Sequence, residues 1–179
     1  MLLYYVLFVL PAVAAVSLVL YLPWGLAGRR RGGLAYHLPR YALVGYGLSL
    51  LYLTILWYYP NITFRPEYYF WNLRPFVWVT EVYDMGLRRM LEQLAMNVLM
   101  FVPLGLLLPV DFPRLRSLPR TALAVLGTTM AIEITQFFMG RSADIDDVIM
   151  NFAGGLLGWC LFRLLNCRPG RCWKKMLGE

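Results

Sequence analysis

The stretch EITQFFMGRSADIDDVIMNFAGGLLG, residues 133–158, decides the fold because it sets polar side chains between two long apolar runs. Those runs, residues 121–139 and 148–165, approach the length of a membrane-spanning helix, which is about 20 residues. A carboxylate near the centre of a bilayer costs roughly 3 kcal/mol on insertion scales, so such a residue is a candidate for function. The candidates in this stretch are Glu133, Gln136, Arg141, Asp144, Asp146, Asp147 and Asn151.

The composition of the whole chain also indicates a membrane protein. Of its 179 residues, 60% are hydrophobic, whereas soluble domains contain about 45–50%. Three further apolar runs, residues 2–22, 41–59 and 94–110, bring the expected spans to five. The sequence therefore predicts one domain over residues 1–179, an all-α bundle of five transmembrane helices. Arginines follow the first run instead of preceding it, which favours a span over a cleaved signal peptide.

The positive charges indicate how the helices cross the membrane. The net charge is +7, but the basic residues flank the apolar runs, which is typical of membrane topology, and no nucleic-acid partner is expected. With five spans, 12 of the 17 basic residues lie on one side. The positive-inside rule then places the N-terminus outside and the C-terminus inside, with residues 60–93 and 140–147 outside. The outer basic residues are Arg65, Arg74, Arg88, Arg89 and Arg141.

Helical spacing indicates which polar side chains meet at the outer face. Residues three or four positions apart share a helix face, and two such sets are Glu133 with Gln136, and Asp144 with Asp147 and Asn151. We expect Glu133 to be at least partly buried and paired with Arg141, Asn97 or Asn151.

The last apolar run carries small residues at a spacing that favours close helix packing. Gly154 and Gly158 form a GxxxG pattern, which lets a second helix approach. We therefore expect this helix to pack centrally. The outer loop contains an aromatic run, YYFWNLRPFVW at residues 68–78, which either lies on the membrane surface or is buried over the helix ends.

Three interpretations of the polar cluster remain open from the residues alone. In the first it is structural: Arg141 neutralises the aspartates, and Asp144 or Asp146 caps the last helix. In the second it is an outward-facing pocket that holds a divalent cation through oxygen ligands or a lipid-linked headgroup, with Arg74 suited to phosphate. In the third, the aspartates supply the acid and base of a membrane hydrolase.

Three blocks of sequence resemble the VanZ-like family of bacterial membrane proteins over roughly residues 40–165. The blocks are NLRPF, NVLMFVPLGLLLP, and E-x-x-Q followed by GR-x-x-D-x-D-D-x-x-x-N. The resemblance implies a multi-pass protein of the bacterial plasma membrane with a role in the cell envelope. The family is named for a member associated with low-level resistance to teicoplanin. The matching motif residues are Asn72, Pro75, Asn97, Pro103, Gly105, Glu133, Gln136, Arg141, Asp144, Asp146, Asp147 and Asn151.

The favoured hypothesis is therefore a protein that binds an envelope molecule at its outer face. The expected partner is a membrane lipid, a lipid-linked cell-wall precursor or a glycopeptide, and a divalent cation is the one cofactor considered. The alternative is an integral membrane enzyme that acts on a lipid-linked substrate. The sequence does not decide whether the protein is an enzyme, but it favours the binding protein over this alternative. The oligomeric state is not predicted. The expected binding residues are Asn72, Arg74, Asn97, Glu133, Gln136, Arg141, Asp144, Asp146, Asp147 and Asn151.

Overall fold

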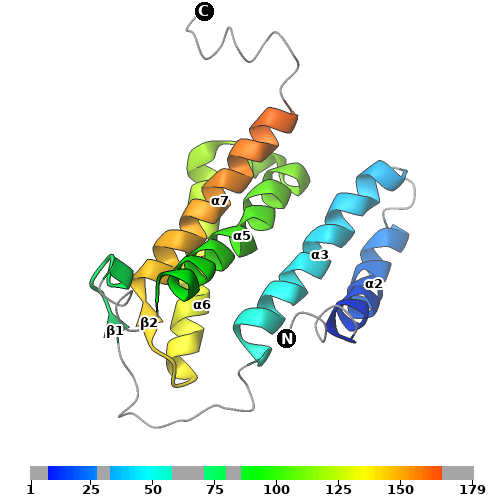
Figure 1. The fold of residues 1–179 in the computed structure, drawn as a ribbon. Coiled ribbons are helices and arrows are strands. Elements are labelled where there is room, and N and C mark those ends of the chain that lie inside the picture. Colours follow the sequence, from blue (N-terminus) through cyan, green and yellow to red (C-terminus); the bar gives the residue numbers. More distant parts are fainter. Residues whose placement is uncertain (1–7, 28–32, 58–70, 80–85, 167–179) are drawn as a thin grey trace, which may run out of the picture.

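The computed structural model of this chain describes residues 8–27, 33–57, 71–79 and 86–166. Its helices are α2 (Leu10–Ala27), α3 (Leu34–Thr54), α5 (Leu87–Asp111), α6 (Leu118–Phe138) and α7 (Ile145–Leu165), with a short 3₁₀ turn, η4 (Pro113–Leu115), between α5 and α6 (Figure 1). Two strands of two residues, β1 (Trp71–Asn72) and β2 (Ala143–Asp144), form a parallel pair. The predictions for the first residues of span 2–22, for the arginines at 29–31, for residues 58–70 and for the basic tail lie outside the described residues.

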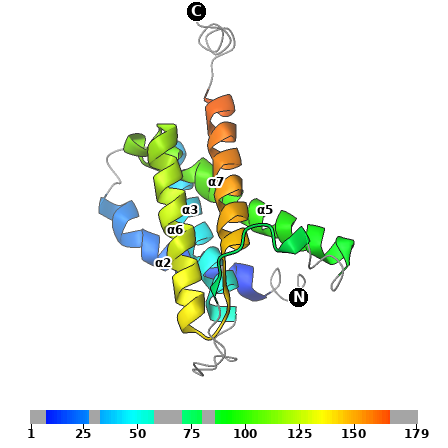
Figure 2. The same ribbon diagram turned by 90° about the vertical axis from the view of Figure 1, so that its left-hand side faces the viewer.

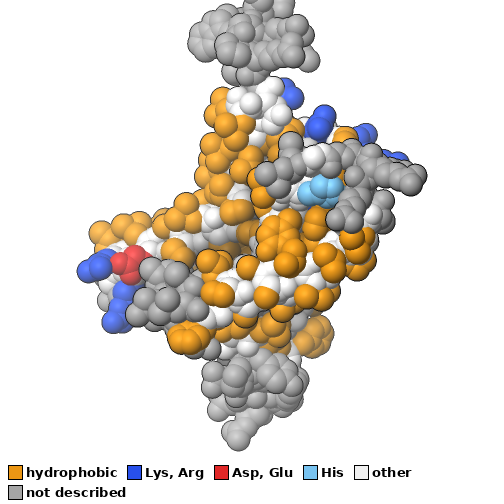
Figure 3. All heavy atoms as spheres, turned by 90° about the vertical axis from the view of Figure 1, so that its right-hand side faces the viewer, with side chains coloured by type: hydrophobic (Ala, Val, Ile, Leu, Met, Phe, Trp, Pro, Cys, Tyr) orange, Lys and Arg blue, Asp and Glu red, His pale blue; other side chains and the backbone are white. Residues whose placement is uncertain are grey.

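Three of these helices, α5, α6 and α7, are long and apolar enough to cross a membrane. The fold is thus that of an all-α membrane protein. Large apolar side chains stand on its surface, such as Leu99, which is 61% exposed, and Leu123, which is 71% exposed. Among the side chains coloured in Figure 3, hydrophobic ones predominate on this face, and the charged ones gather in separate places. Such a surface suits hydrocarbon better than water.

The helices begin earlier than the sequence predicted, and those boundaries were wrong. Helix α3 begins at Leu34 instead of 41, α5 at Leu87 instead of 94, and α7 at Ile145 instead of 148. The predictions stopped at charged residues, but these charges are accommodated within the helices. Arg40 donates to the carbonyl of Tyr36 at 2.5 Å and lies over its ring, and Arg88 pairs with Glu92 at 2.8 Å. Long side chains near helix ends can keep their charge outside the apolar layer.

Helix α7 packs between α5 and α6 (Figure 2), which agrees with the central position predicted from the spacing of its glycines. Gly154 faces the carbonyl of Val98, and Gly158 faces the carbonyl of Val102, so closely that a Cβ on either glycine would overlap the α5 backbone. The prediction of close packing at these two positions is confirmed. It matters for the site because it fixes the start of α7 against α5 and α6.

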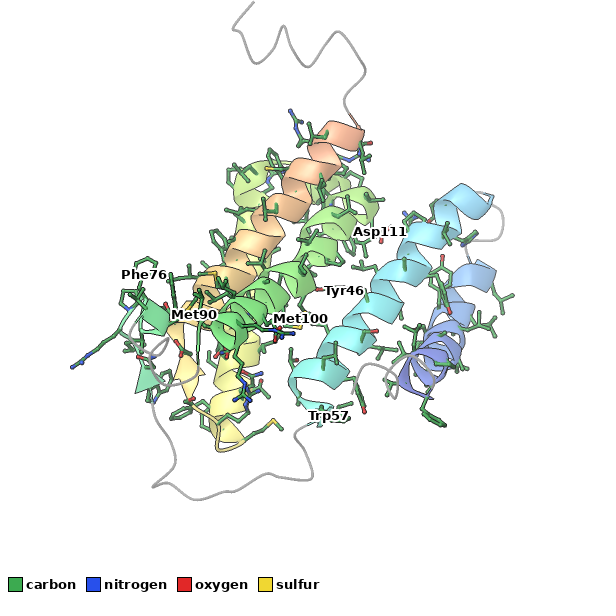
Figure 4. All side chains as sticks on the ribbon, in the orientation of Figure 1. Tyr46, Trp57, Phe76, Met90, Met100 and Asp111 are labelled. Carbon is green, nitrogen blue, oxygen red and sulfur yellow. The ribbon has the colours of Figure 1, made fainter. Side chains whose placement is uncertain are left out.

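Helix α3 attaches the α2–α3 pair to the other helices through two polar contacts. The hydroxyl of Tyr46 donates to the carbonyl of Met100 on α5 at 2.8 Å (Figure 4). At the end of α3, the carbonyl of Thr54 accepts from Nε2 of Gln136 at 3.0 Å. Between these contacts, Leu50 of α3 packs into the apolar core with Phe101 of α5. The end of α3 therefore lies at the same level as the predicted site.

Candidate functional site

The site lies where α6 ends, α7 begins and the segment of residues 71–79 returns to the helices. Strand β1 pairs with β2 in the register Trp71 to Ala143 and Asn72 to Asp144. The side chain of Asn72 adds a second link, since its Nδ2 donates to Oδ2 of Asp144 at 3.1 Å. Two segments about 70 positions apart in the sequence are thus held side by side.

Asp144 is the residue that organises the start of α7. It is the N-cap, and its Oδ1 accepts the backbone N–H of Asp146 at 2.9 Å. Aspartate is favoured at this position because it accepts an otherwise unpaired helical N–H and because its charge suits the positive end of the helix dipole. Its own backbone N–H donates to Oε2 of Glu133 on α6 at 3.2 Å. The capping role that the structural interpretation gave to Asp144 is therefore present.

Asp146 fixes the segment of residues 71–79, which we name the Trp71–Val79 loop. Asp146 is 6% exposed, and its carboxylate accepts the backbone N–H groups of Phe76 at 2.6 Å and Val77 at 2.9 Å. Phe76 has a φ of 66°, a left-handed conformation that is uncommon for a bulky residue. Consecutive N–H groups in such a conformation form a concave anion site. Here the anion is supplied by the protein itself, and it holds the loop in this shape.

The outward side of the Trp71–Val79 loop is apolar and carries one cation. Trp71, Leu73 and Phe76 are each more than half exposed, and Phe76 lies at the edge of the molecule (Figure 4). A loop buried over the helix ends, one of the two predicted alternatives, does not fit these exposures. Arg74 is exposed as well, and only its backbone joins the network, by donating to Oδ1 of Asn72. The indole N–H of Trp78 is buried and has no acceptor among the described residues.

Glu133 is 5% exposed, so the prediction of its burial is confirmed. Its hydrogen-bond donor is the backbone N–H of Asp144, while the predicted amide partners Asn97 and Asn151 bind elsewhere. The charge of Arg141 nevertheless acts on Glu133 and on Asp147. Arg141 lies half-buried in the turn after α6.

A second layer of polar contacts lies one helical turn deeper. Nδ2 of Asn97 on α5 donates to Oδ1 of Asp147. Nδ2 of Asn151 donates to the hydroxyl of Thr129 on α6 at 3.1 Å, and Asn151 is only 3% exposed. Its Oδ1 is buried without a partner among the described residues. Helices α5, α6 and α7 are therefore joined by side-chain hydrogen bonds below the loop.

Four of the ten expected binding residues form one hydrogen-bonded network, to which Arg74 contributes only its backbone: Asn72, Glu133, Asp144 and Asp146. The other side-chain contacts are separate pairs, Asn97 with Asp147, Asn151 with Thr129 and Gln136 with Thr54, and Arg141 acts on Glu133 and Asp147 through its charge. The sequence interpretation missed Thr54, Trp78 and Thr129, which supply a carbonyl, an indole N–H and a hydroxyl. Thr129 could have been found, because it stands four residues before Glu133 on the same face. Thr54 could not, because it acts through its backbone.

The hydrogen bonds limit the chemistry of the cluster. Each carboxylate oxygen of Asp144 and of Asp146 accepts one N–H group, and these contacts cap α7 and hold the Trp71–Val79 loop. No three His, Cys, Asp or Glu side chains among the described residues are grouped to hold a metal ion. Side-chain oxygens without a hydrogen-bond donor in the described part remain on Glu133, Asp147 and Asn151.

Comparison with known proteins supports the resemblance of the motif blocks. Residues 41–166, more than half of the chain, match the model of the VanZ/LLP1 family. A stretch of 71 residues is 46% identical to Protein VanZ of Enterococcus faecium. This match covers 39% of the chain and 44% of the relative, so the chain spans less than half of the length of that relative. No solved structure matches the chain significantly.

Proposed function

Because this chain belongs to the VanZ/LLP1 family, we propose that it binds an anionic, amphipathic molecule of the bacterial envelope at the Trp71–Val79 loop. The molecule is a membrane lipid or a lipid-linked cell-wall precursor. Binding it would alter the susceptibility of the cell to the glycopeptide teicoplanin. The observation that carries the proposal is the pair of hydrogen bonds from Phe76 and Val77 to Asp146, which hold an exposed apolar loop in one shape.

The side chains of the Trp71–Val79 loop suit such a molecule. Arg74 offers an exposed guanidinium beside the apolar surface of Leu73 and Phe76. Guanidinium groups bind phosphate through paired hydrogen bonds, and aromatic side chains are enriched where a membrane meets water.

We also propose that the protein crosses the plasma membrane five times, with the site outside. The proposal rests on the unequal division of basic residues and on the arrangement of the helices. The ends of α3 and α6 and the starts of α5 and α7 lie at the level of the site, and the α5–α6 connection lies at the other end (Figure 1). Arg40, Arg114, Arg116 and Arg120 belong to that other end, which would face the cytoplasm.

Cysteine labelling tests this topology. In a chain with Cys160, Cys167 and Cys172 changed to serine, we expect Ser142→Cys to react with a membrane-impermeant maleimide in intact cells. The matched control is Ser117→Cys, at an exposed position in the α5–α6 connection, which should react only after permeabilisation. The reverse pattern would refute the proposed orientation.

Co-purifying lipids test the binding function. We expect Arg74→Ala to lower the amount of anionic lipid or lipid-linked precursor that co-purifies by about tenfold, since a hydrogen bond to a charged group contributes roughly 1.5–3 kcal/mol. Mass spectrometry of the purified protein measures this, and cells that express the variant should become as susceptible to teicoplanin as cells without the protein.

Arg88→Ala is the control, because Arg88 is exposed near the same end but pairs with Glu92 on its own helix. It should leave lipids and susceptibility at the parent level. If Arg74→Ala carries the same lipids in the same amounts and susceptibility is unchanged, the binding function is wrong and the cluster is structural.

A further inference from the structure

The cluster beneath the Trp71–Val79 loop holds more negative than positive charge. Among the described residues it contains the carboxylates of Glu133, Asp144, Asp146 and Asp147, and the positive charge of Arg141 acts on Glu133 and Asp147. Each carboxylate oxygen of Asp144 and Asp146 already accepts one hydrogen bond. Glu133 and Asp147, which come from different helices and whose charges act on each other, each keep one oxygen that no described residue donates to. Two negative charges this close repel each other, and a bound cation would offset that repulsion.

Asn151 provides a second, independent observation. The residue is only 3% exposed, yet its side-chain Oδ1 has no hydrogen-bond donor among the described residues. Asn151 lies one turn after Asp147 on α7, and helical side chains lean toward the N-terminal end of their helix, here toward Asp147. Its Nδ2 is held by Thr129, one turn before Glu133 on α6. The free oxygen therefore lies in the α6–α7 interface, about one helical turn from the level of Asp147 and Glu133.

We infer that Glu133, Asp147 and Asn151 bind one divalent cation of the Ca²⁺ or Mg²⁺ type between α6 and α7. Both ions prefer carboxylate and amide oxygens and complete their coordination with water. The set contains two carboxylates and one amide, which agrees with the lack of any group of three acidic, His or Cys side chains in the described structure. Two negative ligands match the charge of a divalent ion.

The inferred cation would help the protein to bind its anionic ligand. The inference rests on the proposed function only for the identity of that ligand. A bound divalent ion would cancel the charge of Glu133 and Asp147, which otherwise repels a phosphate near the Trp71–Val79 loop. The cation itself can be measured without any lipid, so its absence and a failure of lipid binding are distinguishable.

The test is a metal titration of lipid-free protein in a non-ionic detergent after removal of metals with EDTA. We expect Mn²⁺, followed by electron paramagnetic resonance, to bind saturably at one site, and Ca²⁺ or Mg²⁺ to compete for it; the more effective competitor identifies the native type. Glu133→Gln and Asp147→Asn should each weaken the Mn²⁺ affinity by about tenfold or more, equivalent to about 1.4 kcal/mol. The control is Glu92→Gln, an exposed carboxylate on α5, which should bind like the parent.

Asn151→Asp keeps the test informative even if Glu133→Gln or Asp147→Asn fails to fold. The hydroxyl of Thr129 can donate to an aspartate, so the contact between α6 and α7 is kept, and a third carboxylate should tighten Mn²⁺ binding several-fold because affinity rises with ligand charge. A purely structural amide predicts no such gain. Absence of saturable binding by the parent, or equal affinity of the parent, Glu133→Gln and Asp147→Asn, would overturn the inference, and an Asn151→Asp affinity no higher than that of the parent would remove Asn151 from it.

Discussion

Gly154→Ala and Gly158→Ala are each expected to destabilise the protein by about 3 kcal/mol. Extra volume in a well-packed interior costs about 1–3 kcal/mol and sometimes more. The upper part of this range applies because the added Cβ would meet the carbonyl oxygens of Val98 and Val102, which belong to the α5 backbone and cannot turn aside. Helix α5 would have to move away from α7, and the hydrogen bond from Asn97 to Asp147 would be lost with it.

Thermal unfolding of the purified variants in detergent measures the effect. At about 2–4 °C per kcal/mol for a chain of this size, the melting temperature should fall by about 6–12 °C. Gly127→Ala on α6 is the matched control, since a Cβ there meets nothing within 4 Å. It should melt at or above the parent temperature, because alanine favours a helix over glycine. Parent-like melting of both α7 variants would show that the two helices do not pack this closely.

Asp146→Asn is expected to release the Trp71–Val79 loop from the helices. An amide offers one acceptor oxygen where the carboxylate offers two, and its NH₂ group would point at a backbone N–H. Phe76 or Val77 thereby loses its acceptor, and the other hydrogen bond loses the contribution of the charge. At roughly 1.5–3 kcal/mol for each hydrogen bond to a charged group, a loss of about 3 kcal/mol follows.

Hydrogen exchange measures this release directly. A loss of about 3 kcal/mol corresponds to roughly 100-fold faster exchange of the amides of residues 76 and 77, read by mass spectrometry of peptides from this segment. Exchange within α7 should change far less, because Asp144 still caps the helix. Glu92→Gln again serves as the control and should exchange like the parent. Unchanged protection of residues 76 and 77 in Asp146→Asn would mean that the carboxylate does not hold the loop, and the proposed binding surface would lose its support.

Several features of the protein followed from the sequence because they depend on residues within a few turns of one another. Apolar runs near the length of a bilayer determine that helices form and that they suit a membrane. The spacing of Gly154 and Gly158 determines which face of α7 receives another helix. Asp144 caps α7 because its side chain needs only the N–H two residues later. The clustering of Glu133 and Asp147 at one end likewise followed from their positions near the ends of adjacent apolar runs.

Other features were decided only by the tertiary structure. The helix starts were misjudged because charge was taken as a boundary, whereas Arg40 and Arg88 find partners on their own helices. The role of Asp146 could not be predicted from the sequence either. Its partners are two backbone N–H groups about 70 positions earlier, those of Phe76 and Val77. Neither the type of these two residues nor their spacing in the sequence indicates that they would bind a carboxylate. A backbone contact across that distance depends on the path of the whole chain, which local physical chemistry does not determine.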